Sequence, residues 1–389
     1  MKKGLGDRIL LKNGLLVNSD SGQWELADIL IEGTKISRVA PKIEREKGIL
    51  TLDLKEGFVL PGLIDCHTHV GIIEEGSGKI GVDNNEISDP VTPNLRGIDG
   101  VNPLDMAFMD AVRSGITAVM TGPGSNNVVG GLNLVVKTYG NIIDQMVVRN
   151  PAGLKVAFGE NPITTYGQDK KAPVTRMGTA SLIRELFMKT QDYMERKAKG
   201  KVEERIMQLE AVIPVLKGEI PLRAHAHRAD DIVTAIRVAE EFEIEKLVIE
   251  HGTEADLVAD YLYRKNIPVA FGPMLTPRIK MELRRRSYGS VIKLVEKGIK
   301  VALITDHPYN SIDQLRTVAA LEVAEGLKPV DAIRCLTIHP AEILGCDQQI
   351  GRIQEGYDAD LAIFAGNPLD LNSKVIFTLV NGKIVYQKK

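Results

Sequence analysis

Short apolar runs alternate with amphipathic stretches through the middle of the chain, and this alternation limits the possible folds more than any other feature. The runs typical of buried strands include "GITAVMTG", "GLKVAFGEN", "IPLRAHAH", "KLVIEHG", "IPVAFGP" and "IKVALITDHP". Most are separated by stretches with apolar residues at three- and four-residue steps, such as "DIVTAIRVAEEF", "ADLVADYLYRKN" and "GSVIKLVEKG". Repeated strand–helix units predict a parallel sheet with right-handed crossovers.

The number of strand candidates narrows the choice of α/β fold. With "VLPGLID" and the hairpin-like "NVVGGLNLVVKTYGN" added, there are about eight candidates, the number in a (β/α)8 barrel. We therefore predict a barrel with insertions over residues 61–345, and a doubly wound open sheet is the alternative. The segment from Met177 to Lys217 is expected to be an outsize helical region, broken at "AKGKVEER".

The two ends of the chain resemble each other and differ from the middle. Both contain apolar runs with a turn signal between them, as in "RILLKNGLLV" near the start and "KVIFTLVNGKIVYQ" near the end. Isolated hairpins rarely bury enough area to be stable. Residues 1–60 and 346–389 are therefore expected to pair into one small composite β domain.

Charge and cysteine content exclude several classes of protein. The 389 residues include 49 Lys or Arg and 51 Asp or Glu, so neither nucleic acid nor an anionic membrane surface is expected as a partner. The cysteines lack CxxC spacing, which argues against a thiolate zinc site and suits a reducing compartment.

No membrane or export signal is read from the sequence. No apolar stretch approaches the roughly 20 residues that a membrane helix needs. The segment "MKKGLGDRILLKNG" has no signal-peptide pattern, so a soluble cytoplasmic protein is expected. The oligomeric state is left open, with a homo-oligomer among the expectations.

Histidine and carboxylate residues lie where the predicted strands end. Because the carboxyl ends of barrel strands meet at one face, these side chains are expected to point into one mouth. They are His67, His69, Glu160, His225, His227, His251 and Asp306. Imidazole nitrogens and carboxylate oxygens without thiolates suit zinc, manganese, iron or nickel. One such residue is commonly a satisfied polar group, but packing does not explain the whole set, so a metal site is predicted.

Several segments together resemble the metal-dependent amidohydrolase superfamily, nearest to its imidazolonepropionase-like branch. They are "LPGLIDCHTH", "HAH", "IEHG", "TDHP", "TIHPAEILG" and "IGRIQEGYDADLAIF", and the resemblance covers nearly the whole chain. It implies a (β/α)8 barrel whose metal-activated hydroxide attacks a carbonyl or ring carbon bonded to nitrogen. It also implies that the two chain ends form a β-sandwich and that the substrate is a small molecule with an amide bond.

The resemblance assigns roles to individual residues. His67 and His69 resemble the pair on the more buried ion, and His225 and His251 resemble ligands of a second ion. Asp306 resembles the strand-eight aspartate that binds metal and moves the proton, so it is the expected catalytic residue. Two ions per chain are expected, with zinc as the expected metal.

The fourth strand departs from the superfamily's commonest pattern, a carboxylated lysine that bridges two ions. Lys155 is expected at the start of its strand, on the wrong side of the barrel, whereas Glu160 is expected at the carboxyl end. Glu160 is therefore predicted as the carboxylate ligand.

Three further residues are candidates for substrate contact. His227 shares the inward register with His225 and could replace it as ligand, while Arg176 and Arg228 could clamp a substrate carboxylate or form surface salt bridges. The deaminase branches place a glutamate three residues after the strand-five ligand, where this chain has Arg228. Hydrolysis of a linear or cyclic amide, a dipeptide or an N-acyl amino acid is therefore favoured over deamination. A non-catalytic structural or regulatory protein is the alternative of another class.

Other conspicuous residues have simpler interpretations. His307 is expected to point away from the centre, and His339 and Cys66 are expected to pack. The loop "TGPGSNNVVGGLN" lacks the Gly-Lys-Ser/Thr ending of a P-loop and is expected to shape the pocket.

Overall fold

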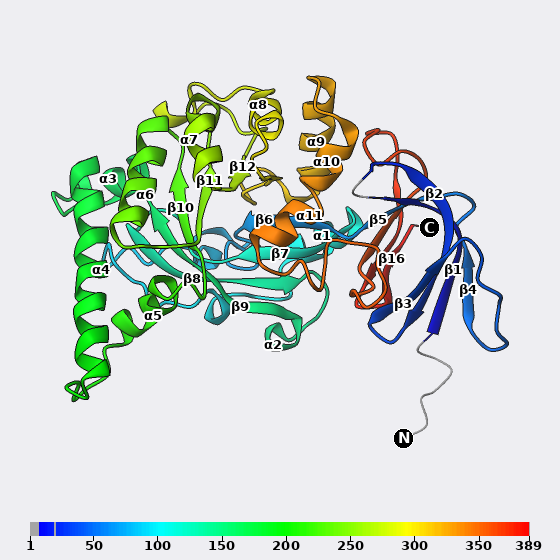
Figure 1. Cartoon of the computed structure of the whole chain (residues 1–389), viewed down its shortest axis with the longest axis horizontal. Coiled ribbons are helices and arrows are strands. Elements are labelled where there is room, and N and C mark those ends of the chain that lie inside the picture. The colour runs from blue at the N-terminus through cyan, green and yellow to red at the C-terminus, as the bar shows by residue number, and fades with distance from the viewer. Residues whose placement is uncertain (1–7, 19–20, 389) are drawn as a thin grey trace.

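The structure is a computed structural model that describes residues 8–18 and 21–388. Residues 1–7, on which the absence of a signal peptide was partly judged, lie outside the described residues. Within the described chain there are two eight-stranded sheets. In Figure 1 one sheet lies at the right and the other occupies the centre, surrounded by helices.

The first sheet is built from both ends of the chain. Its strands are β1 (Arg8–Val17), β2 (Trp24–Glu32), β3 (Lys35–Ala40), β4 (Leu50–Asp53), β5 (Phe58–Pro61), β14 (Leu361–Phe364), β15 (Val375–Val380) and β16 (Lys383–Gln387). The order is β16-β15-β14-β5-β1-β2-β3, with β4 also pairing with β1. The antiparallel β5–β14 ladder, from Phe58 opposite Phe364 to Pro61 opposite Leu361, joins the two chain ends. Figure 1 shows blue strands from the start of the chain and red strands from its end together at the right.

Alternating apolar residues give this sheet a buried interior, as expected for a sandwich. Ile29 and Ile31 of β2 pack in one apolar cluster with Val59 of β5 and with Leu361 and Ile363 of β14. Each of these side chains is 0% exposed. Because the cluster draws on both ends of the chain, neither end could bury its apolar face alone.

The second sheet is the barrel. Its strands are β6 (Leu63–Thr68), β7 (Ile116–Thr121), β8 (Val129–Lys137), β9 (Val147–Ala157), β10 (Leu222–Ala226), β11 (Leu247–His251), β12 (Val269–Phe271) and β13 (Val301–Leu303), and they lie in chain order. The barrel and the composite β-sandwich are therefore as predicted.

The barrel sheet is parallel except at β8, which lies in the segment predicted to be hairpin-like. β8 is antiparallel to both β7 and β9, whereas the other neighbouring pairs are parallel. A parallel crossover needs about a dozen residues or more, usually with a helix. The connections on either side of β8, residues 122–128 and 138–146, are shorter than this, and the second contains only the four-residue helix α2 (Ile143–Met146).

Side-chain and loop hydrogen bonds connect the first and last barrel strands, which share no ladder among the described residues. The Asp65 carboxylate accepts hydrogen bonds from the Thr305 backbone N–H, at 3.0 Å, and from the Thr305 hydroxyl, at 2.6 Å. The Asp306 N–H donates to the His67 carbonyl at 3.2 Å. These bonds hold the ends of β6 and β13 together at the mouth.

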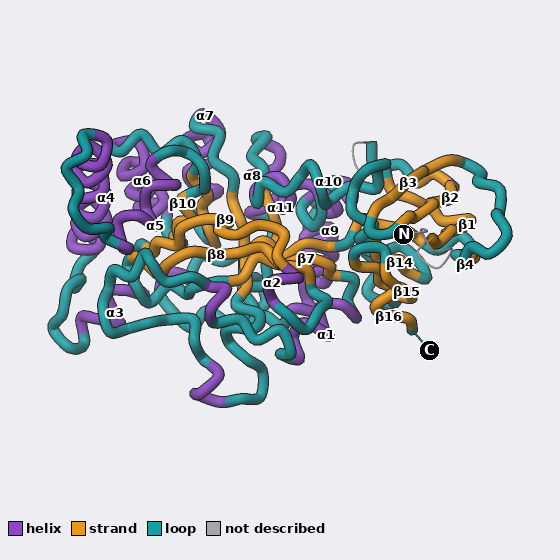
Figure 2. The backbone as a smooth tube through the Cα atoms, turned by 90° about the horizontal axis from the view of Figure 1, so that it is seen from below, coloured by secondary structure: helices purple, strands orange, loops and turns teal. Residues whose placement is uncertain are grey.

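Helices cover the outside of the barrel. They are α1 (Met106–Arg113), α3 (Glu160–Gly167), α4 (Arg176–Ala198), α5 (Met207–Leu216), α6 (Ala229–Glu241), α7 (Ala259–Arg264), α8 (Ser290–Glu296), α9 (Leu315–Ala324), α10 (Pro329–Arg334) and α11 (Ile338–Ile343). In α6 the apolar residues Ile232, Ala235 and Ile236 are buried at three- and four-residue steps. Figure 2 shows α4, α5 and α6 packed at the end of the barrel away from the sandwich.

The outsize helical region is confirmed as two helices with a break. α4 ends at Ala198 and α5 begins at Met207, so the break falls on the segment predicted to interrupt them. The Thr175 hydroxyl caps the start of α4 by accepting the Gly178 N–H at 3.0 Å. In residues 8–18 and 21–388, no helix combines the length and the apolar character that crossing a bilayer requires.

Candidate metal centre

A cavity of 190 Å³ lies at the carboxyl ends of the barrel strands. Every histidine predicted as a ligand, together with the strand-eight aspartate, lines it: His67, His69, His225, His227, His251 and Asp306. The exposed fraction of these residues ranges from 1% for His67 to 7% for Asp306. A larger cavity of 320 Å³ lies beside the amino ends of β10 to β13, but no histidine lines it.

The side chains are close enough to share bound cations. Asp306 Oδ1 lies 3.2 Å from His67 Nε2 and 3.5 Å from His69 Nε2. The ring of His251 lies 4.3 Å from that of His225 and 4.7 Å from that of His227, centre to centre. Two groups each bring their ligand atoms within 4.8 Å of one another: His67, His251 and Asp306 form one, and His225, His227 and His251 form the other.

Backbone carbonyls fix which ring nitrogen of two histidines faces the cavity. His69 Nδ1 lies 2.9 Å from the Gly122 carbonyl, and His251 Nδ1 lies 3.0 Å from the Gly272 carbonyl. A carbonyl only accepts hydrogen bonds, so each Nδ1 carries the hydrogen and each Nε2 keeps its lone pair. Metal-binding histidines have this arrangement, because the second nitrogen's hydrogen bond sets the tautomer and the ring orientation. His227 Nδ1 similarly lies 2.8 Å from Thr253 Oγ1.

Two residues of the centre have left-handed backbone conformations. The φ angles of His251 and Asp306 are 74° and 55°, which non-glycine residues rarely adopt. Consecutive strand residues normally point to opposite faces, yet Glu250 and His251 both approach His67. The Glu250 Oε1 to His67 Nδ1 distance is 3.0 Å, and the His251 and His67 ring centres are 4.9 Å apart. Such strained residues are concentrated at functional sites.

Burial keeps most of these histidines neutral. It lowers the pKa of His251 to about 3, and it lowers the pKa of His225 and His227 well below the ordinary value. Burial alone would raise the pKa of Asp306, but the surrounding imidazoles of His251, His67 and His69 bring it below its ordinary value. Neutral imidazoles beside an ionised carboxylate are the donor set that a divalent cation requires.

Buried nitrogens without partners also fit a cation. Within the described residues, His225 Nδ1 is buried without a hydrogen-bond partner, and His67 Nε2, 3.2 Å from Asp306 Oδ1, is buried without a well-oriented hydrogen bond. Buried polar atoms are normally satisfied, so each such group needs an explanation. Cations held by this cluster would satisfy ring nitrogens that the protein itself leaves unpaired.

A buried ion cluster lies directly beneath the histidines, and the sequence reasoning missed it. Glu250 contacts Lys155 Nζ through one oxygen, and through the other it lies 2.7 Å from Arg223 Nε and 3.0 Å from His67 Nδ1. Burial alone would raise the pKa of Glu250, but His67, Lys155 and Arg223 lower it well below its ordinary value. The available signal was a charged residue inside an apolar run, in "PLRAHAH", "LKVAF" and "LVIEH".

The expectation for Lys155 is wrong, and the structure does not bring Glu160 to the cluster. β9 begins at Val147, so Lys155 is near its carboxyl end, 1% exposed and paired with Glu250 under the histidines. Gly159, at φ 90°, turns the chain out of the strand, so Glu160 starts helix α3. The Glu160 N–H donates to Glu282 at 2.6 Å, and its side chain does not line the cavity.

The two arginines predicted as substrate clamps are paired with other acids. Arg176 Nε lies 3.0 Å from Asp231, and Arg228 makes two hydrogen bonds of 2.8 and 2.9 Å to Asp230. Neither arginine lines the cavity. Asn161 and Lys280 do line it, and the sequence reasoning missed both.

The remaining predictions about conspicuous residues hold. His307 Nδ1 accepts the Ile312 N–H at 3.1 Å, and His307 belongs to neither of the two groups of possible metal ligands. His339 packs with Nδ1 2.9 Å from the Val301 carbonyl, and burial raises the pKa of the Cys66 thiol to about 12. The glycine-rich loop shapes the cavity through Gly124 and Ser125.

Comparisons with known proteins agree with this architecture. The model of the amidohydrolase family matches residues 58–386. An amidohydrolase from Thermotoga maritima MSB8 has a solved structure that is 42% identical, with a TM-score of 0.94 over 98% of this chain and 100% of that one. A prolidase complexed with N-methylphosphonate-L-proline has a TM-score of 0.64 over 98% of this chain and 100% of that one, and at 18% identity it shares the fold.

A curated relative matches over most of the chain but is much longer. Amidohydrolase tasK of Hapsidospora irregularis is 26% identical over 391 residues, which cover 92% of this chain and 40% of that protein. The chain thus spans well under half of that relative's length. The family match covers the barrel, the strands β5 and β14 to β16 of the sandwich, and all the clustered histidines. This chain therefore belongs to the amidohydrolase family.

Proposed function

We propose that the chain hydrolyses a carbon–nitrogen amide bond in a small molecule, with zinc as its metal and two ions per chain. The observation that carries this proposal is the donor set at the barrel mouth. His67, His69 and Asp306 would hold one ion, and His225 and His251, with His227 beside them, would hold the other. Such cations supply Lewis-acid polarisation of a carbonyl and lower the pKa of water to about 7.

Asp306 has the geometry of the proton carrier. Its carboxylate is the only acidic side chain that lines the cavity in the described part of the chain, and it faces His67 and His69. The neighbouring histidines keep it ionised, so it can accept a proton from the attacking water. It would then deliver that proton to the leaving nitrogen, which leaves as a neutral amine.

The same lining favours hydrolysis over deamination of a nitrogen heterocycle. Deamination by the mechanism of the related branches needs a second acid to protonate a ring nitrogen. The corresponding position is Arg228, whose guanidinium is turned to Asp230 outside the cavity. Dipeptides, N-acyl amino acids and cyclic amides remain the candidate substrates.

The test combines metal analysis of the purified protein with a screen of amides, dipeptides, cyclic imides and aminopurines. We expect zinc to copurify and amide products to form. Release of ammonia from an aminopurine would favour the deaminase instead. A metal-free protein without turnover would favour a structural or regulatory protein.

The role of Asp306 has its own test. Asp306→Asn should retain bound zinc but lose turnover by at least about a hundredfold, because the amide cannot take up the proton. Metal content and kcat are measured on the same preparation. Undiminished kcat in the zinc-loaded variant would remove Asp306 from the proposed role.

A further inference from the structure

The lining of the cavity includes one basic side chain. Lys280 is the only lysine or arginine that lines it within the described residues. Apart from Lys280, the histidines and Asp306, the lining is neutral. It consists of amides, hydroxyls and apolar groups, including Asn84, Asn161, Ser125 and Leu283. A substrate entering this cavity therefore meets one positive charge at a defined place.

Two neighbours hold the Lys280 ammonium in position. Its Nζ donates to Asn161 Oδ1 at 2.9 Å and lies 3.1 Å from Glu282 Oε2. Glu282 is 0% exposed and is itself fixed by the Glu160 N–H. An ammonium has three hydrogens; Asn161 Oδ1 accepts one, and Glu282 Oε2, an ion-pair contact without a well-oriented hydrogen bond, engages at most one more. The Lys280 side chain is 22% exposed, so the third hydrogen is accessible to a ligand in the cavity.

Asn161 lies between Lys280 and the histidines of the candidate metal centre. The Asn161 amide nitrogen lies 3.5 Å from His225 Nε2 and donates to Ser125 Oγ at 2.8 Å. Only one side chain thus separates the ammonium from a histidine of the centre. A group bound to Lys280 would therefore lie one side chain away from His225.

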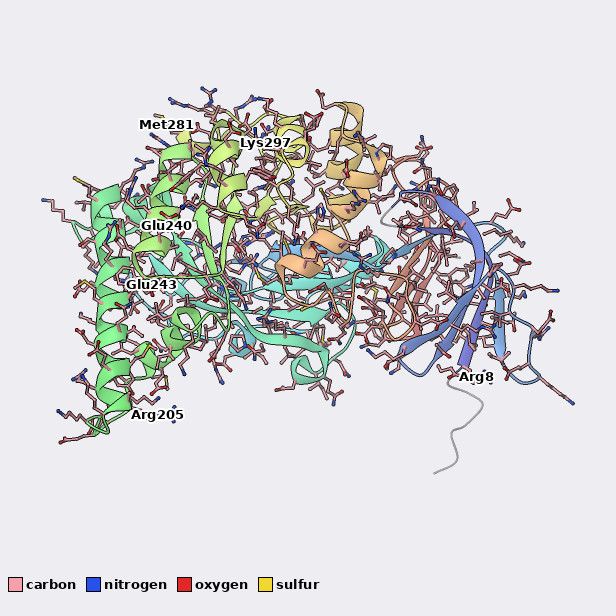
Figure 3. All side chains as sticks on the ribbon, in the orientation of Figure 1. Arg8, Arg205, Glu240, Glu243, Met281 and Lys297 are labelled. Carbon is pink, nitrogen blue, oxygen red and sulfur yellow. The ribbon has the colours of Figure 1, made fainter. Side chains whose placement is uncertain are left out.

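The loop that carries Lys280 is strongly basic. The segment "TPRIKMELRRRS", residues 276–287, contains Arg278, Lys280, Arg284, Arg285 and Arg286 against the single acid Glu282, in a chain with net charge −2. Figure 3 labels Met281, next to Lys280, at the outer edge of the barrel domain. A local concentration of one charge at a cleft attracts ligands of the opposite charge.

We propose that Lys280 binds a carboxylate of the substrate, so that the enzyme acts on N-acyl amino acids or dipeptides rather than on neutral amides or cyclic imides. The inference rests on the proposed amide hydrolysis at the same site. Arg176 and Arg228, the cations that the sequence suggested for this task, do not line the cavity, whereas Lys280 does. Lys280 takes their place.

The experiment compares substrates that differ only in the carboxylate. The zinc-loaded enzyme is given N-acetyl-L-leucine, N-acetyl-L-alanine and L-alanyl-L-leucine, each beside its C-terminal carboxamide. We expect kcat/KM to favour the carboxylates by roughly 10- to 100-fold, the effect of one charge-assisted hydrogen bond. In Lys280→Met this ratio should fall to about one, whereas Lys280→Arg should keep it above one.

A matched control removes a neighbouring charge outside the cavity. Arg284 lies in the same loop, is exposed and contacts Met281 Sδ at 3.8 Å, and it does not line the cavity. Arg284→Met should leave the ratio unchanged. Because each variant is judged by a ratio within one preparation, a general loss of activity or stability does not affect the result.

Binding is measured separately from turnover, as the rise in unfolding temperature when each compound is added. Carboxylate-dependent stabilisation without hydrolysis, lost in Lys280→Met, would support the carboxylate site while contradicting the proposed amide hydrolysis. Equal kcat/KM for both members of each pair, hydrolysis confined to cyclic imides, or a preference that survives in Lys280→Met would overturn the inference. So would the absence of both binding and turnover with every carboxylate.

Discussion

Replacing Lys137 by methionine should reveal how the barrel and the sandwich are joined. Lys137 ends barrel strand β8 and is 3% exposed, and its ammonium contacts Asp360 and lies 2.7 Å from Asp358, just before β14. Removing one partner of a buried ion pair costs about 3–5 kcal/mol, because the remaining charge is buried without compensation. We expect the free energy of unfolding to fall by about that amount.

The two aspartates should not be affected equally. Without Lys137, Asp358 keeps the ammonium of Lys35 at 2.7 Å and the amide of Gln349 at 2.9 Å, whereas Asp360 keeps only the Asn381 N–H at 2.8 Å. The uncompensated charge is therefore that of Asp360. Adding Asp360→Asn to Lys137→Met should recover most of the lost stability, and adding Asp358→Asn should recover about 1 kcal/mol or less.

Urea unfolding provides the measurement. Trp24, the chain's single tryptophan, lies in strand β2, so its fluorescence reports on the sandwich while far-ultraviolet circular dichroism reports on the whole chain. Lys137 does not line the cavity, so kcat should not change. A stability loss below about 1 kcal/mol, or equal rescue by the two asparagines, would refute this reasoning.

Two further predictions concern buried carboxylates. Glu250→Gln should weaken zinc binding by about 10- to 100-fold, measured by competition with a chelator, because Glu250 orients His67 through Nδ1; unchanged zinc affinity would exclude that role. Burial raises the pKa of Glu322 from 4.5 to about 7. Its folded pKa thus exceeds the unfolded value, so its stabilisation is complete below pH 4.5 and is lost as the pH rises through about 7. The glutamine of Glu322→Gln cannot ionise. When the pH is raised from 5 to 8, the free energy of unfolding, measured with urea, should therefore fall by about 2–3 kcal/mol less in this variant than in the wild type. The same pH dependence in both proteins would contradict the raised pKa of Glu322.

The sequence predicted the features that depend on local pattern. The strands from β10 to β13 are buried apolar runs, and the histidines that end β10 and β11 had to meet Asp306, which follows β13, because carboxyl ends converge. The alternation of apolar residues in β8 did not itself encode the antiparallel direction of this strand. The short connections on either side of β8 carried that information instead.

The position of Lys155 was missed because the start of β9 is not apparent from the sequence. The segment "VVRNPAG" contains Pro151, which argues against a strand, so the strand seemed to begin near Gly153. In the structure β9 includes Pro151 and begins at Val147, which moves Lys155 to its far end. The ion cluster around Glu250 joins three strands, and no local pattern specifies such partners.

The ladder between β5 and β14 has a consequence for synthesis. Residues 58–61 leave the ribosome long before residues 361–364, and until then the N-terminal strands lack their partners. During that interval one edge of β5 offers free N–H and C=O groups beside the apolar side chains of Val59 and Leu60, a template for pairing with another chain. Premature termination anywhere in the barrel would make this exposure permanent. Fragments that end between residues 252 and 360 are therefore expected to aggregate even though they contain every histidine of the metal centre.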